Sequence, residues 1–81
     1  MSLSNGQALP DSIKSSFIAL RLYAGKCLVR GLDIDVVIEE MTDKLRNSVA
    51  AHRIRAAGAD FNASVRQAVL QAFEYLNEVK A

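Results

Sequence analysis

The sequence is poor in the residues that shape irregular or sheet-rich folds. It has no tryptophan, one proline, four glycines and only 6% aromatic residues. So few turn-forming residues leave little room for the tight turns of a multi-stranded sheet. Because 51% of the residues are hydrophobic and 23% are charged, the chain does not belong to the disordered class either. These features predict a small all-α protein, and 81 residues are enough for one domain.

Cysteine, excess charge and long apolar runs are also scarce. The single cysteine, Cys27, excludes an intramolecular disulfide framework and a multi-cysteine zinc site, and a lone thiol fits a reducing compartment. A net charge of +1 is not the global basic excess of many nucleic-acid-binding proteins. No run of about 18 apolar residues is free of charges, and the opening MSLSNGQAL has no basic residue. We expect a cytoplasmic protein without membrane contact.

The apolar periodicity predicts a small three-helix bundle in a single helical domain, residues 10–81, after a disordered N-terminal tail, residues 1–9. The predicted helices cover residues 11–30, 34–57 and 62–79. Pro10 precedes the first helix, and Gly31 and Gly58 follow the first two as C-terminal caps. Asp33 and either Asp60 or Asn62 are placed to cap the second and third helices.

The first predicted helix is apolar on two opposite sides. One stripe, expected in the core, contains Ile13, Phe17, Leu20, Ala24 and Cys27. The second stripe contains Ile18, Leu22, Gly25 and Val29. A helix that is apolar on two faces is normally covered on both. We therefore predict a homo-oligomer, with a two-fold dimer favoured, through the second stripe. The alternative is that the other two helices cover both faces within one chain.

The other two helices each have one main apolar stripe. Helix 34–57 aligns the following residues at helical spacing: Ile34, Val37, Ile38, Met41, Leu45, Val49 and His52. Helix 62–79 aligns Val65, Ala68, Val69, Ala72, Leu76 and Val79, widened by Phe73. These stripes predict the faces that pack against the first helix.

Charges are grouped along the chain. Residues 14–30 hold four basic and no acidic side chains, residues 33–43 hold five acidic and no basic ones, and residues 44–66 hold five basic and one acidic. An antiparallel pair of the first two helices would gather a patch for an anionic partner: Lys14, Arg21, Lys44, Arg46, Arg53 and Arg55. The alternative is that these charges only complement the helix dipoles.

Two short stretches resemble known motifs. AHRIRAAG, residues 51–58, resembles the histidine phosphotransfer motif, which implies that His52 accepts a phosphoryl group. A phosphate acceptor must face solvent, however, whereas the periodicity places His52 on the core stripe. The connection AAGADFN resembles the turn of a helix-turn-helix, which implies DNA binding by the helix that follows. Neither resemblance extends beyond these residues.

The sequence predicts no catalytic, cofactor-binding or metal-ligating residues, because it holds no phosphate loop, nucleophile–base pair or ligand cluster. The function we predict is that of a small non-enzymatic interaction protein, which binds and modulates a macromolecular partner. Adaptors, inhibitors and anti-activators of bacteria and phages often have this size and build, which is an analogy of fold alone. The alternative is a nucleic-acid-binding transcriptional regulator that uses the basic residues above, and a third is phosphotransfer through His52.

Overall fold

The computed structural model describes residues 11–80, and these form four helices with no strand among them. In chain order they are α1 (Asp11–Val29), α2 (Ile34–Lys44), α3 (Val49–Ala56) and α4 (Phe61–Lys80). The all-α class is confirmed, whereas the predicted count of three helices is wrong. The expected tail, residues 1–9, and Pro10 lie outside the described residues.

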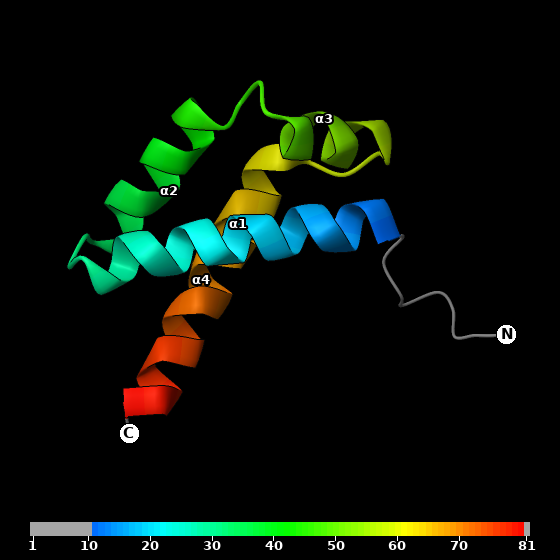
Figure 1. Ribbon diagram of the computed structural model, residues 1–81. Helices are drawn as coiled ribbons and strands as arrows, with labels where there is room; N and C mark the ends of the chain where they lie inside the picture. The colour runs from blue at the N-terminus through cyan, green and yellow to red at the C-terminus, as the bar shows by residue number, and fades with distance from the viewer. Residues whose placement is uncertain (1–10, 81) are drawn as a thin grey trace, which may run out of the picture.

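The four helices form a flat arrangement. The Cα atoms extend over 40 × 31 × 15 Å. In Figure 1, α3 lies along the N-terminal half of α1 and α2 lies near its C-terminal end, while α4 crosses α1 and continues beyond it. Each neighbour therefore covers a different part of α1, and the C-terminal end of α4 projects from the rest of the molecule.

Glycine ends α1 and α3, as the sequence predicts. Gly31 and Gly58 have φ angles of 93° and 86°, in the left-handed region that L side chains rarely adopt. After α1, the amides of Gly31 and Leu32 donate to the carbonyls of Leu28 and Cys27. The amides of Gly58 and Ala59 repeat this pattern after α3. Both ends are Schellman motifs, which satisfy the carbonyls that a helix end leaves free.

Ser48 divides the predicted helix 34–57 into α2 and α3. Its Oγ accepts a hydrogen bond from the Ala51 amide at 3.1 Å and donates one to the Leu45 carbonyl at 2.7 Å. Its backbone is extended, with φ −74° and ψ 165°, as at a helix N-cap. The serine side chain here forms hydrogen bonds with backbone groups in place of helical ones. One helix can therefore end and another begin without glycine or proline.

The restart at Ser48 changes which face of the following helix is buried. Ala51 and Ile54 of α3 lie in the core, whereas Val49 and His52 are exposed. The predicted core positions of Val49 and His52 are therefore wrong. The two predictions came from extending the periodicity of α2 through residues 45–48, where the helix is interrupted.

The core draws on all four helices. Its largest fully buried side chains are Leu20, Val37, Met41, Ile54, Val65 and Val69. Cys27 is buried and unpaired, as its place on the first stripe predicts. Along α4 the predicted core stripe holds as far as Ala72, but Phe73 and Val79 are exposed, so the prediction is wrong at its C-terminal end. No described helix is long and apolar enough to span a lipid bilayer.

Candidate protein-docking groove

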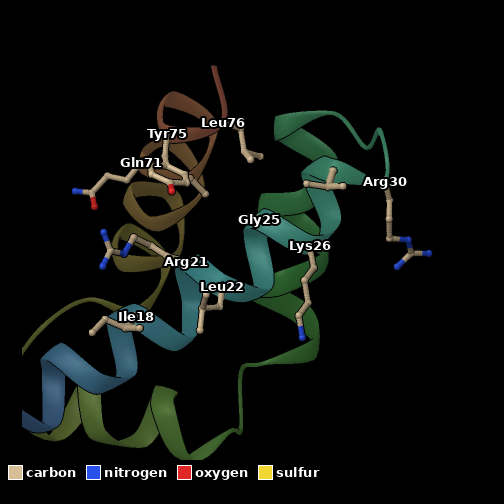
Figure 2. Close-up of a pocket in the computed structure, with 11 residues that line it drawn as sticks. Ile18, Arg21, Leu22, Gly25, Lys26, Arg30, Gln71, Tyr75 and Leu76 are labelled. Carbon is tan, nitrogen blue, oxygen red and sulfur yellow. The ribbon is translucent and has the colours of Figure 1, made fainter. Parts of the chain in front are cut away.

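An open apolar groove lies between α1 and the C-terminal half of α4. Its volume is about 890 Å³. Figure 2 shows the two walls, with α1 on one side and the last turns of α4 on the other. The α1 wall includes the predicted second stripe: Ile18, Leu22, Gly25 and Val29. From α4 the groove is lined by Gln71, Ala72, Tyr75 and Leu76.

The α1 wall presents large apolar side chains to solvent. Ile18, Leu22 and Val29 are 44%, 64% and 71% exposed. A Cβ atom built on Gly25 would meet nothing within 4 Å, so the surface above this glycine is open. The alternative that one chain covers both faces of its first helix is therefore wrong. The structure gathers the four predicted interface residues on one open surface, while the homo-oligomer itself stays a prediction.

The α4 wall is the part of the groove that the sequence did not predict. Leu76 lines the groove and, with Val79, continues the apolar stripe of α4 beyond Ala72, where α4 runs past α1. Leu76 is half-buried, and Tyr75 and Val79 are exposed. No signal in the sequence could have found it, because only the crossing of α4 over α1 shows which end of α4 projects.

Basic side chains flank the apolar α1 stripe on both sides. In Figure 2, Arg21 extends on the side of α4, near Gln71, while Lys26 and Arg30 extend on the opposite side of the helix. The Arg21 guanidinium also lies 5.6 Å from the centre of the Phe17 ring. No acidic residue lines the groove. The groove therefore combines an apolar surface with positive flanks.

The six basic residues of the predicted anion-binding patch fall into three environments. Lys44 and Arg46 pair within their own turns, with Glu40 at 4.0 Å and with Asp43 at 2.6 Å. Arg21 belongs to the groove. Lys14, Arg53 and Arg55 are exposed, and Arg55 stacks over Phe61 with 5.2 Å between its guanidinium carbon and the ring centre. Binding of an anionic partner by these residues stays a prediction.

His52 is exposed on α3, and no described side chain bonds to its imidazole. The solvent access that a phosphate acceptor needs is therefore present, contrary to the expectation from the periodicity. Phosphotransfer through His52 stays a prediction, because exposure is a property of many surface histidines. Among the described residues, no three His, Cys, Asp or Glu side chains come together in a way that could hold a metal ion.

A second, smaller hollow lies between α2 and α4. Ile34, Ile38 and Leu70 line it together with Asp35, Glu39 and Arg66, so apolar and charged side chains of both signs alternate. Unlike the groove between α1 and α4, it offers no continuous apolar surface.

No protein-family model matches the chain, and neither the curated proteins nor the solved structures give a significant match. The function of this chain is therefore inferred from its own geometry alone.

Proposed function

We propose that this chain is a non-enzymatic helical interaction protein that binds and modulates a protein partner, with the groove between α1 and α4 as its docking surface. The observation that supports the proposal is the exposed apolar stripe of α1 facing the projecting end of α4. Apolar surface gathered in one hollow and flanked by charged residues is typical of protein-binding sites. We also propose that the chain forms a homo-oligomer through α1.

A helix is the partner element that suits this surface. The groove lies between two helices, and a third helix laid in it would contact both walls, as in helix-in-groove recognition. Covering a side chain such as Leu22 removes apolar area from water and contributes on the order of 1–2 kcal/mol. Several such side chains line one continuous groove, so their contributions add over one contact surface.

The proposal is tested by placing a charge in the groove. We expect Leu22→Asp to lose the protein partner that wild-type protein captures from a lysate of the cells that make it, because a buried unpaired carboxylate opposes docking. Val49→Asp is the matched control, since Val49 is 65% exposed against 64% for Leu22 but lies on α3. Mass spectrometry of the captured proteins is the measurement. A partner retained equally by both variants contradicts the proposal.

Nucleic-acid binding is the second candidate, supported by the exposed Lys14, Arg53 and Arg55, none of which forms an ion pair with a described side chain. We expect a gel shift that weakens steeply between two salt concentrations, because each phosphate contact releases counterions. Arg53→Ala with Arg55→Ala should abolish the shift, while Lys44→Ala with Arg46→Ala, whose side chains are already paired, should reduce it much less. Absence of a shift at low salt removes this candidate.

A further inference from the structure

The projecting end of α4 has the properties expected of a helix that binds in the groove. Tyr75 and Val79 expose apolar surface there, and Leu76 is only half-buried. The same two turns carry the acidic residues Glu74 and Glu78, both exposed. The segment is therefore an amphipathic helix with negative charge beside its apolar side.

The α1 wall of the groove has the opposite charge. Between residues 14 and 30 the sequence has four basic side chains and no acidic one, and Arg21, Lys26 and Arg30 flank the open stripe. The ion pairs among the described side chains join Lys44 to Glu40 and Arg46 to Asp43. Neither the three basic residues of α1 nor the two glutamates of α4 are paired within the described part of the chain.

We propose that a second copy of the chain occupies the groove, so that the C-terminal end of α4 from each copy packs against α1 of the other. This inference rests on the proposed function, because it names an occupant of the same groove. One chain carries both complementary surfaces, which is the condition for a closed two-fold dimer in which each contact occurs twice. The net charge of +1 adds little repulsion between the copies.

Charge selects this arrangement over a direct pairing of the two α1 helices. The open stripe has basic residues on both sides and no acidic ones, so two α1 stripes laid together would set like charges beside each other. Packing α1 against α4 of the second copy instead sets Arg21, Lys26 and Arg30 beside Glu74 and Glu78. The contact also covers Leu22 and Tyr75, which a single chain leaves exposed.

The arrangement has a consequence for an outside partner. A partner helix that enters the groove has to displace α4 of the second copy, so self-association and partner binding compete for one surface. An acidic amphipathic helix is then the element best suited to displace it, because it reproduces the charges of α4.

Charge reversal tests the arrangement. The acidic-α1 variant carries Arg21→Glu and Lys26→Glu, and the basic-α4 variant carries Glu74→Lys and Glu78→Lys. In each variant alone the substituted side chains face like charges in both contacts of the dimer, so we expect self-association to weaken by about tenfold or more. In an equimolar mixture both contacts join opposite charges again, so the mixture should form a one-to-one dimer of near wild-type affinity.

Sedimentation velocity gives the affinities and native mass spectrometry identifies the mixed dimer, with circular dichroism confirming that each variant folds. Asp35→Lys with Glu39→Lys on α2 provides a control with the same net charge as the basic-α4 variant. This control variant should dimerise alone, and in a mixture with the acidic-α1 variant only a small fraction of the dimers should contain both chains. A mixture that pairs no better than its separate components overturns the arrangement, as does a wild-type protein that is monomeric at its highest soluble concentration.

These outcomes separate the inference from the proposed function. A monomeric wild type that still captures a protein through Leu22 overturns the inference and the homo-oligomer, and it leaves the docking of a protein partner in the groove standing. A wild type that dimerises, with a Leu22→Asp variant that captures the same proteins as the wild type, contradicts docking of an outside partner in the groove and leaves the inference standing.

Discussion

The two apolar faces of α1 differ in their surroundings more than in their composition. Leu20 and Ala24 on one face are buried by the other helices, whereas Leu22 on the opposite face is 64% exposed. Both faces have apolar residues at helical spacing, and the sequence alone leaves open whether the chain covers both of them. The first face contributes to folding, and we assign the second to association. An apolar stripe therefore becomes a candidate site only when the fold leaves it open.

The largest expected effect is a loss of stability when a leucine on the buried face of α1 is truncated, and a leucine on the open face provides the comparison. Leu20→Ala should lower the free energy of unfolding by about 2–4 kcal/mol, because it removes a fully buried side chain and leaves a cavity. Leu22→Ala should change it by no more than about 0.5 kcal/mol, as is usual for surface substitutions. Urea unfolding at a concentration where the protein is monomeric measures both. Equal losses would contradict the division of α1 into a folding face and an association face.

A substitution at Gly25 should have a smaller effect, which raises the stability of the chain and lowers the affinity of the dimer. A Cβ atom there has open space around it, and alanine is the better helix former, so Gly25→Ala should raise the free energy of unfolding by roughly 0.5–1 kcal/mol. If α4 of a second copy approaches α1 closely at this glycine, the same methyl group should weaken the dimer. Urea unfolding and sedimentation of one variant give both values. A dimer strengthened by the substitution would argue against close approach at Gly25.

Much of the fold follows from local signals in the sequence. Gly31 and Gly58 end helices where predicted, and the Asp60 Oδ2 accepts a hydrogen bond from the Ala63 amide at 2.9 Å, as its predicted capping role requires. Asp33 stands at the N-cap of α2 but forms no side-chain cap bond. Such signals are readable because they depend on a few neighbouring residues.

The remaining features depend on contacts that local signals do not contain. The break at Ser48 is one example, because a serine within a helix and a serine at a helix cap differ little in sequence. In the structure Ser48 caps α3, and α3 packs on α1. The exposure of His52 follows from that break. The α4 wall of the groove depends on where α4 crosses α1, a tertiary property. The α1 wall, by contrast, could be predicted residue by residue from the spacing of Ile18, Leu22, Gly25 and Val29.

The most direct test of the central claim is the solution mass of the wild-type chain beside that of Leu22→Asp across a concentration series. Wild-type protein should approach the mass of two 8.8 kDa chains, while Leu22→Asp should keep the helical content of the wild type and the mass of one. A wild type and a variant that share one mass at every concentration would contradict the assignment of the open face of α1 to association.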